Sequence, residues 1–525
     1  MKTQENNSTI LRPSRRAVLA TGAAFTGLAA SGLGFGEARA AQKRGGSIRA
    51  ALGHGSTTDT LNPGTWENDF VNGLGYAYCG YLTGVRRDGS LEPQIAESWE
   101  ASADAKQWRF KIRSGVTFHS GKPVTPEDVV ASINFHRGED STSAAKPLVD
   151  AVIDISVDGD TVVFNLQAGS ADFPFTFTDY HLAIMPAGGE RGIDWRSMDG
   201  CGPYKLVDFQ PGVSVKLVKN ENDWDPNRGF FQEIEVLSIV DANARTTAFL
   251  SGDVQLIDKI DLKTIAPLSR NKNIKIHSVA GNQHYTFAMS VNQDPFKDVN
   301  IRRALKYSVN RQELVDKILF GYGSIGNDHP IGRGQRFYND EMPQTAYDPD
   351  KAKFYLKEAG LDSLTVSLSA ADAAFGGAVD AAVLFQNSAK SAGIDLTVNR
   401  VPNDGYWADV WMKHSFSAVY WGGRPVEDAM FTTAYAEGAA WNDTFWNNAR
   451  FNELLIAARA ELDEAKRREM YYEMQLILNE DGGAIIPMFA NFVFATAANI
   501  DTGGDDFSSH WDKDGHRWWE RWSFA

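Results

Sequence analysis

Residues 292–311 read N-Q-D-P-F-K-D-V-N-I-R-R-A-L-K-Y-S-V-N-R, and the rest of the chain can be placed from this stretch. An apolar, strand-like run at 285–291 precedes it. After the turn, apolar residues recur at the spacing of one buried helical stripe: Ile301, Ala304, Leu305 and Val309. Asn310 is a good N-cap for a second helix, with Glu313 three residues later. The pattern predicts a strand that leads into a packed pair of helices.

The same letters resemble a family signature. From Pro295 to Arg311 the chain matches P-F-x-D-x-x-[IV]-R-x-A-[LI]-x-x-[AS]-[VI]-[DN]-R, which is similar to the middle signature of the family 5 extracellular solute-binding proteins of peptide, opine and nickel ABC importers. Further blocks at 76–98, 116–130, 200–204 and 242–256 resemble the same family in the same order. The resemblance implies a bilobed α/β periplasmic-binding-protein fold of class II, in the large cluster with an extra small domain.

The domain organisation follows from length and from this resemblance. A chain of 525 residues is too long for a single ordinary core. The resemblance implies that a first lobe is built from 41–75, 198–285 and 490–525. It places an inserted small domain at 76–197 and a second lobe at 286–489.

Local patterns predict most of the elements. A capping box at Thr125 and Asp128 opens a helix. Alternating strands and helices between 364 and 400 indicate parallel crossover units. The remaining expectations are a strand at 45–52, hairpins at 152–166 and 204–218, a long helical region at 452–480, an apolar run at 484–489 that ends the second lobe, and a tryptophan-rich tail that packs on the first lobe.

Residues 1–40 read as an export leader. A basic start precedes an uncharged run rich in Ala and Gly, and Ala38-Arg39-Ala40 offers a cleavage site. Ser14-Arg15-Arg16 resembles a twin-arginine signal. A membrane anchor is the alternative, although the run is only weakly hydrophobic. The leader contains no cysteine for lipid attachment, so we expect a soluble periplasmic protein.

Charge and cysteine content narrow the function. The net charge is −15, and because the leader is basic, the rest of the chain is more acidic still. Such a surface repels nucleic acid and anionic lipid. Cys79 and Cys201 are the two cysteines, and they either pair in the oxidising periplasm or lie buried as small apolar residues. We expect a monomer.

Patterns for catalysis and metal binding are mostly absent from the sequence. Gly115 to Lys122 is one residue too long for a phosphate loop, and the ten histidines form no H-E-x-x-H pattern. We therefore predict no catalytic residue, no metal and no cofactor. A secreted hydrolase stays open as an alternative, because glycosidases need only two carboxylates. Nickel or haem binding within the same family is a further alternative.

The segment 406–431 is the most informative part of the sequence about the ligand. Peptide binders of the family read W-x-x-D where this chain has Trp421-Gly422-Gly423-Arg424, so an aspartate for the ligand's ammonium group is replaced by a guanidinium. Either Glu427 or Asp428 meets the amine, or the ligand presents a carboxylate or phosphate to Arg424, which we favour. The third possibility is that Arg424 only pairs with one of these acids.

The predicted ligand-binding residues lie in the segment 406–431 and at Cys79. Cys79 stands where some peptide binders place a glutamate that helps line the site. The predicted ligand-binding residues are Tyr406, Trp421, Gly422, Arg424, Glu427, Asp428 and Cys79. The resemblance implies a protein that captures a peptide or amino-acid-derived solute between two lobes and delivers it to the membrane permease of an ABC importer. Ligand contact with both lobes would select the closed state.

Overall fold

The computed structural model describes residues 42–403, 406–424, 426–439, 441–509 and 511–525, and residues 42–525 form one compact unit. The predicted leader lies outside the described residues. Within them, no helix combines the length and the apolar character that crossing a bilayer requires. The predicted lobe boundaries are kept below as names for the parts of the chain.

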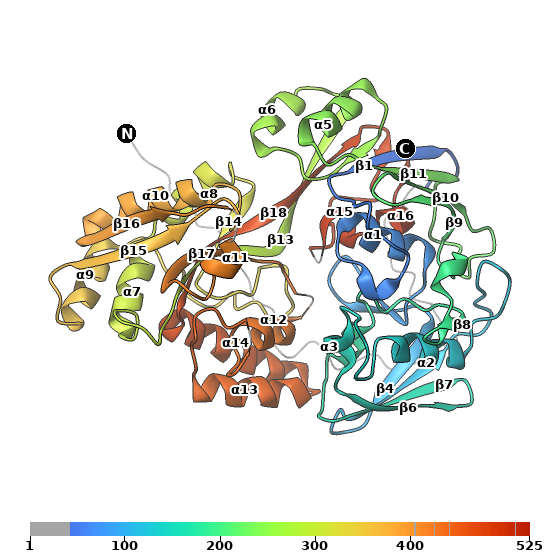
Figure 1. Cartoon of the computed structure of the whole chain (residues 1–525), viewed down its shortest axis with the longest axis horizontal. Coiled ribbons are helices and arrows are strands. Elements are labelled where there is room, and N and C mark those ends of the chain that lie inside the picture. Colours follow the sequence, from blue (N-terminus) through green and yellow to red (C-terminus); the bar gives the residue numbers. More distant parts are fainter. Residues whose placement is uncertain (1–41, 404–405, 425, 440, 510) are drawn as a thin grey trace, which may run out of the picture. The chain divides into compact units, whose positions relative to one another are not determined.

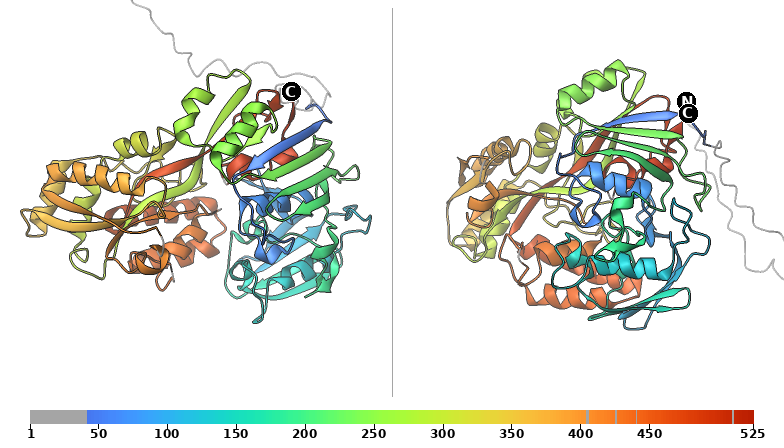
Figure 2. Two further views of the ribbon diagram at one scale, coloured as in Figure 1. Left: turned by 45° about the horizontal axis from the view of Figure 1, so that its top comes forward. Right: turned by 45° about the vertical axis from the view of Figure 1, so that its right-hand side comes forward.

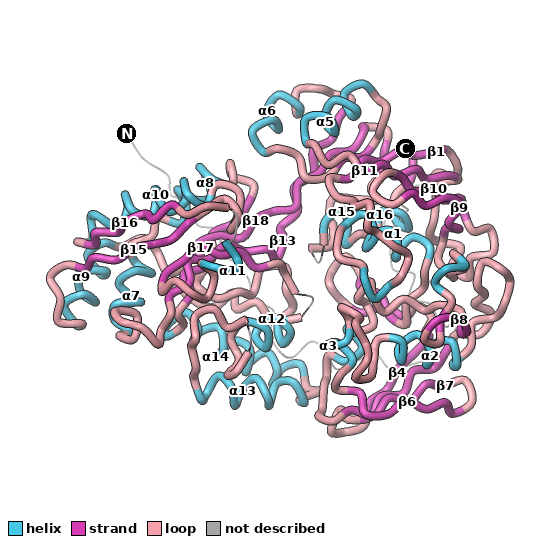
Figure 3. The backbone as a smooth tube through the Cα atoms, viewed as in Figure 1, coloured by secondary structure: helices cyan, strands magenta, loops and turns pink. Residues whose placement is uncertain are grey.

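One 11-stranded sheet runs through both lobes (Figures 1 and 3). Its first-lobe half pairs β1 (Ser47–Leu52) in parallel with β11 (Glu233–Ser238) and β12 (Leu256–Ile257). The hairpin of β9 (Tyr204–Gln210) and β10 (Ser214–Lys219) completes that edge. This confirms the strand expected at 45–52 and the hairpin at 204–218.

Two long strands join the halves. β13 (Ile274–Met289) and β18 (Ala484–Ala497) are antiparallel, from Ile274 beside Ala497 in the first lobe to Ala288 beside Ala484 in the second. Their register shifts between Ala280 and His284, where the ladder is interrupted. Figure 2 shows the two strands crossing between the groups of elements from two further sides. The sequence predicted only the end of β13, at 285–291, and marked 484–489 as the end of the second lobe without predicting that a long strand begins there.

The second lobe contains the predicted crossover. β15 (Leu364–Ala370) and β16 (Ile394–Arg400) are parallel and are connected by α10 (Ala378–Ala389). β17 (Phe416–Trp421) lies between β15 and β13. The helix pair that the opening stretch predicts is present as α7 (Val299–Tyr307) and α8 (Arg311–Ile318). Asn310 accepts a hydrogen bond from the Glu313 backbone N–H at 3.2 Å, as an N-cap should.

The long helical region expected at 452–480 is present, and it is divided into two helices. Two helices, α13 (Ala449–Ala460) and α14 (Glu464–Asp481), occupy the region. The carboxylate of Asp463 accepts hydrogen bonds from the backbone N–H groups of Ala465 and Lys466, so a new helix begins there. The apolar positions continue across this break, so the periodicity alone did not show that an N-cap at Asp463 divides the region into two helices.

The small domain is built on a four-stranded sheet with the order β4-β5-β7-β6. Its strands are β4 (Ala96–Ala101), β5 (Gln107–Ile112), β6 (Val152–Asp158) and β7 (Thr161–Leu166), with α2 (Pro126–Phe135) packed beside them. The capping box of Thr125 and Asp128 is formed as predicted. A short hairpin of β2 (Thr83–Val85) and β3 (Leu91–Pro93) leads into this domain.

The C-terminal tail packs into the first-lobe core, as expected from its tryptophans. Trp518, Trp519 and Trp522 are buried there, in α16 (Trp518–Arg521) and just after it. The remaining elements are α1 (Asp69–Tyr78), α3 (Lys146–Val149), α4 (Phe173–Thr176), β8 (Ala187–Glu190), α5 (Ala242–Ser251), α6 (Ile265–Leu268), β14 (Gly323–Ile325), α9 (Pro349–Glu358), α11 (Tyr406–Asp409), α12 (Glu427–Ala434), β19 (Ile500–Asp501), α15 (Asp512–Gly515) and β20 (Ser523–Phe524).

Candidate functional site

Two cavities lie on either side of the interruption in β13. Cavity A, of ≈ 410 Å³, is lined by Asn282 together with Asp88, Ser90, Phe175, Arg336 and Glu427. Cavity B, of ≈ 390 Å³, is lined by Gln283 together with Asp69, Lys259, Gly422, Gly423 and His516. Both are of the size that small ligands occupy. Each is bounded by residues of the first lobe or small domain on one side and of the second lobe on the other.

The end of β17 separates the two cavities. Gly422 and Gly423 follow the strand and line cavity B, whereas Val426 and Glu427 line cavity A. A Cβ atom at Gly423 would lie 2.5 Å from the Asn282 Cβ, so only glycine permits this approach of the strand end to the interrupted part of β13. The segment that the sequence singled out therefore lies between two cavities.

Arg424 follows Gly422 and Gly423, which line cavity B, but it is not itself among the described residues that line cavity A or B. One guanidinium nitrogen, Nη1, donates hydrogen bonds to the carbonyl oxygens of Gly422 at 3.1 Å and Gly423 at 3.2 Å. Among the described residues no carboxylate forms an ion pair with it. Burial lowers the pKa of Arg424, whereas Tyr180 and Asp179 across the cleft act to raise it. The guanidinium is thus a partly desolvated cation that forms no ion pair with a carboxylate of the described residues, although Asp179 acts on it from a greater distance.

The two acids that follow Arg424 have different environments. Asp428 forms an ion pair with Arg459 at 3.1 Å. Glu427 is 1% exposed, and its Oε1 accepts a hydrogen bond from the Phe337 backbone N–H at 2.7 Å. Burial raises the pKa of the Glu427 carboxyl. Neither acid pairs with Arg424, so the pairing that the sequence left open is not formed.

The other three predicted residues are buried in packing roles. Trp421 packs against Trp411 and Trp441, with ring centroids 6.4 Å away in each case. The Tyr406 hydroxyl donates to the Ala418 carbonyl oxygen at 2.6 Å inside the second-lobe core. Cys79 is buried at the end of α1, and burial raises the pKa of its thiol. None of the three is among the described residues that line cavity A or B.

The cysteines are both buried as free thiols. Cys79 belongs to the first-lobe core and Cys201 to the core of the small domain. A Cβ atom at Gly80 would lie 2.7 Å from the Cys201 sulfur, so only glycine fits beside this thiol. Of the two possibilities that the sequence left open, the structure has the buried, unbonded thiols.

The first-lobe wall of cavity B is a cluster of compensated charges. Oxygen atoms of Asp69, Asp258 and Asp512 lie within 4.8 Å of one another. The Lys513 ammonium group lies 2.9 Å from Asp512 and 3.3 Å from Asp258, and Lys259 lies 3.0 Å from Asp69. Three carboxylates could hold a cation, but these lysines already supply the positive charge. The wall is therefore held together by a network of ion pairs.

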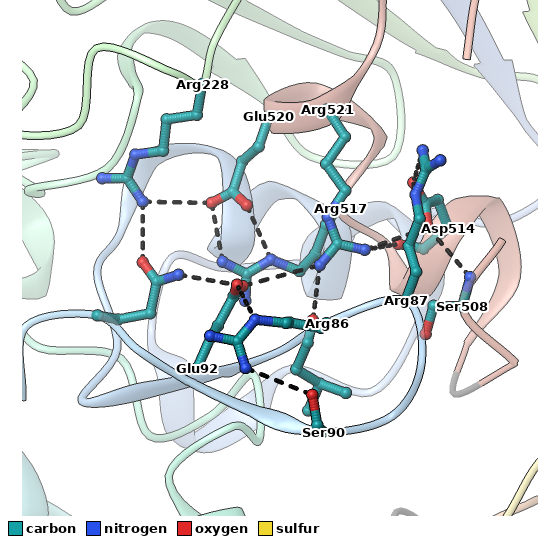
Figure 4. A network of polar contacts seen from close by, with 12 residues as sticks. Arg86, Arg87, Ser90, Glu92, Arg228, Ser508, Asp514, Arg517, Glu520 and Arg521 are labelled. Carbon is teal, nitrogen blue, oxygen red and sulfur yellow. Dashed lines mark hydrogen bonds and ion pairs between the residues drawn. The ribbon is translucent and has the colours of Figure 1, made fainter. Parts of the chain in front are cut away.

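A second polar network fixes the β2–β3 hairpin, which forms part of cavity A (Figure 4). Arg87 pairs with Asp514 at 2.6 Å, and Arg521 donates to the Val85 carbonyl oxygen at 2.6 Å. Arg517 and Arg228 both reach the Glu520 carboxylate, at 2.8 and 3.4 Å. The C-terminal segment thereby holds the hairpin in place.

The opposite wall of cavity A is tied to the small domain through Asp172. Its carboxylate pairs with Arg467 at 2.5 Å and with Arg336 at 2.9 Å, and both arginines belong to the second lobe. Arg336 also lies 3.4 Å from Glu464. These two ion pairs therefore link the small domain directly to the second lobe.

The sequence missed several lining residues. Asn282 and Gln283 follow Gly281 in the middle of β13, and a glycine followed by two amides inside a strand is a signal for an interruption. Asp69, Lys259 and Arg336 carried no local signal, because their neighbours in space are far apart in the chain.

Comparisons with known proteins agree with this architecture. Residues 90–443 match the bacterial extracellular solute-binding proteins, family 5 middle region. The dipeptide-binding protein of Escherichia coli is 26% identical over 449 residues, which cover 75% of this chain and 80% of that protein. The heme-binding protein A of Haemophilus influenzae is 26% identical over 297 residues, and the match spans 51% of this chain and about half, 54%, of that protein.

A solved structure shows the same fold. The ABC transporter-associated periplasmic binding protein DppA of Helicobacter pylori, in complex with the peptide STSA, superposes with a TM-score of 0.71 at 20% identity, and the match covers 92% of this chain and 98% of that one. The bilobed α/β fold predicted from the sequence is thereby confirmed.

Proposed function

Because the chain belongs to the bacterial extracellular solute-binding proteins of family 5, we propose that it captures a peptide or amino-acid-derived solute with an acidic group and delivers it to the inner-membrane permease of an ABC importer. Family members work outside the cytoplasm, and we place this protein in the periplasm as a monomer. The protein itself makes and breaks no covalent bond in this role.

The observation that carries the proposal is the state of Arg424. A partly buried guanidinium that has no carboxylate partner among the described residues, and that directly follows two glycines lining a cavity of ligand size, is suited to a carboxylate or phosphate of the solute. Two hydrogen bonds to backbone carbonyl oxygens already orient it, so little conformational entropy is lost when an anion binds.

Transport requires that binding be coupled to a change in conformation. Both cavities are bounded by the two lobes, and β13 and β18 connect these lobes at the interruption between Ala280 and His284. A solute that contacts both walls favours the closed state by its differential affinity for that state. We propose that the interruption is the hinge.

Haem is a second candidate solute, because one relative is named as a heme-binding protein. Its propionate groups would also present carboxylates to Arg424. No contact in the described residues favours a hydrolase, and the matched proteins are named for binding rather than for catalysis.

The test is a thermal-shift screen of the purified protein against dipeptides and longer peptides, opines, organic acids, haemin and Ni²⁺, followed by calorimetry. For an acidic solute, Arg424→Asp should weaken binding by at least ~2 kcal/mol, about 30-fold, because two anions then face each other in a desolvated site. Arg400→Asp, at the exposed end of β16, is the matched control and should leave affinity unchanged. Unchanged affinity in Arg424→Asp would exclude Arg424 from the site.

A further inference from the structure

A third cavity, cavity C, of ≈ 540 Å³, lies within the second lobe and shares no lining residue with cavities A and B. It is bounded by α7, the start of α9, the end of α14 and the segment 342–346. Three cationic side chains line it: Arg303, Lys306 and Lys351. In the described part of the chain none of the three forms an ion pair with a carboxylate. The cavity therefore gathers positive charges that the protein does not pair.

Lys306 is the most deeply buried of these cations, with a side chain that is 2% exposed. Its ammonium group donates hydrogen bonds to the carbonyl oxygens of Leu478 at 3.0 Å and Asn479 at 2.8 Å. An ammonium group has three N–H donors, and the third has no partner among the residues that the structure describes. Burial lowers the pKa of Lys306 to about 8, and the attraction of Asp328, which is itself paired with Arg311 at 2.6 Å, does not offset this effect.

The other carboxylates around cavity C do not neutralise it. Asp481 pairs with Arg302 at 2.7 Å. Asp348 lines the cavity, and its carboxylate accepts a hydrogen bond from the Lys351 backbone N–H at 2.9 Å as the N-cap of α9. Glu480 lines the cavity from an exposed position. Three cations and two acids leave the lining with a net charge of +1, in a chain whose net charge is −15.

Helix capping accounts for only part of this positive charge. The Arg303 Nε donates to the Glu480 carbonyl oxygen at 3.0 Å, and together with Lys306 it satisfies the last carbonyl groups of α14. The two terminal nitrogens of Arg303 donate no hydrogen bond within the described chain. The Lys351 ammonium group caps no helix end. Donors therefore remain for an acceptor from outside the protein.

Two aromatic rings lie directly beside the cations. Tyr307 and Tyr355 both line cavity C, and their rings are stacked, with centroids 5.7 Å apart and an interplanar angle of 14°. The Lys351 ammonium lies 4.3 Å from the centroid of the Tyr307 ring, and the Arg303 guanidinium lies 5.7 Å from that of Tyr355. The cavity thus combines a flat aromatic surface with unpaired donors.

We propose that cavity C is a second ligand site, for a small molecule in which a carboxylate or phosphate group is joined to a planar apolar group. The anion accepts the third N–H of Lys306 and the free N–H groups of Arg303 and Lys351, and the planar group packs on the tyrosine rings. This inference goes beyond the proposed function and does not depend on it, because no residue that lines cavity A or B takes part.

Phenyl phosphate and benzoate are suitable probes, because each joins one anionic group to one aromatic ring. Both are titrated into the intact protein by calorimetry at low ionic strength, where charge pairing is least screened. At least one probe should bind. Tighter binding of phenyl phosphate would identify the ligand as a phosphate, and tighter binding of benzoate would identify it as a carboxylate. Absence of binding by both probes would overturn the site.

Lys351→Ala removes an exposed cation from the rim of cavity C and should weaken binding of the probe at least fivefold. Lys357→Ala is the matched control, because Lys357 is an exposed lysine of the same helix that does not line the cavity, and affinity should stay unchanged. Lys306→Met should weaken binding at least tenfold. Because Lys306 also caps α14, its fold is checked by circular dichroism, and the Lys351→Ala result stands without it. Equal affinity in wild type and Lys351→Ala would contradict the proposal.

Arg424→Ala separates this site from the proposed solute site. The probes are themselves anions, and they should bind this variant as tightly as wild type if they occupy cavity C. A loss of binding in Arg424→Ala would place the probes next to the interlobe cleft, which would overturn the inference on cavity C and support the proposed role of Arg424. The two proposals therefore fail by different results.

Discussion

The first-lobe wall and the second-lobe wall differ in whether their buried charged side chains form ion pairs within the protein. On the first-lobe wall, Asp258 and Asp512 share the Lys513 ammonium group at 3.3 and 2.9 Å, and all three side chains are buried. On the second-lobe wall, Arg424 and Glu427 are three residues apart and neither has an ion-pair partner in the described chain. The buried charges of the first-lobe wall compensate one another, whereas the second-lobe wall combines a paired acid, Asp428 with Arg459, with two charges that have no ion-pair partner in the described chain. We propose that the solute supplies a partner for Arg424.

Because of this difference, substitutions on the first-lobe wall should change the stability of the fold, whereas substitutions of Arg424 should change the affinity for the solute. Removing one partner of a satisfied buried cluster leaves an uncompensated charge and destabilises the fold. Removing a charge that has no ion-pair partner in the protein should leave the free energy of unfolding nearly unchanged. It should weaken the binding of a solute that contacts this charge. The substitutions below test this division in order of decreasing expected effect.

The largest effect is expected from Lys513→Met on the first-lobe wall. Asp258 and Asp512 would then face each other without the ammonium group, because Lys513 contacts both. The free energy of unfolding should fall by about 3–5 kcal/mol. Urea denaturation measures this. A loss below about 1 kcal/mol would show that the first-lobe wall is not held together by its charges.

A smaller effect of opposite sign is expected from Asp443→Asn in the second lobe. Burial raises the pKa of Asp443 to about 7, and the Trp411 indole N–H donates to its carboxylate at 3.2 Å. Between about pH 4, the ordinary value for aspartate, and pH 7 the folded protein binds more protons than the unfolded chain, so stability falls as pH rises through this window. The amide carries no charge and still accepts from Trp411.

Asp443→Asn should therefore stabilise the protein by about 2–4 kcal/mol at pH 8 and by almost nothing at pH 4. Denaturation curves at the two pH values measure the difference. Equal effects at both pH values would mean that the gain does not come from ionisation of Asp443.

The sequence predicted those features that depend on neighbouring residues. The N-cap at Asn310 and the capping box at Thr125 are local hydrogen bonds, so the residue types sufficed. The missing partner of Arg424 could be suspected because the segment 421–428 is short enough to compare with a family pattern. Lys513 could not be placed, because its partner Asp258 is 255 positions away. Cavity A depends on Asn282, whose exposure is set by long-range strand pairing.

Arg424→Ala should change binding and leave stability nearly unchanged. Within the described residues the side chain donates only to backbone carbonyl oxygens of its own segment, at 3.1 and 3.2 Å, so the free energy of unfolding should change by less than about 1 kcal/mol. Affinity for an acidic solute should fall by about 2 kcal/mol, since a charge-assisted hydrogen bond is lost. Calorimetry and a melting curve on the same sample measure both. A large drop in melting temperature would show that Arg424 stabilises the fold, as the paired charges of the first-lobe wall do.

The smallest effect is expected from Lys259→Ala, which tests whether exposure rather than pairing decides the cost. Lys259 pairs with Asp69 at 3.0 Å, but its side chain is 40% exposed, so its removal should cost less than about 1 kcal/mol of stability. His54 reports the change, because burial and then Lys259 lower the pKa of its imidazole, whereas Asp69 acts to raise it. Without Lys259 the His54 pKa should rise, and an NMR titration measures this. An unchanged His54 pKa would mean that solvent already screens this lysine, and that the compensated wall is confined to the buried cluster around Lys513.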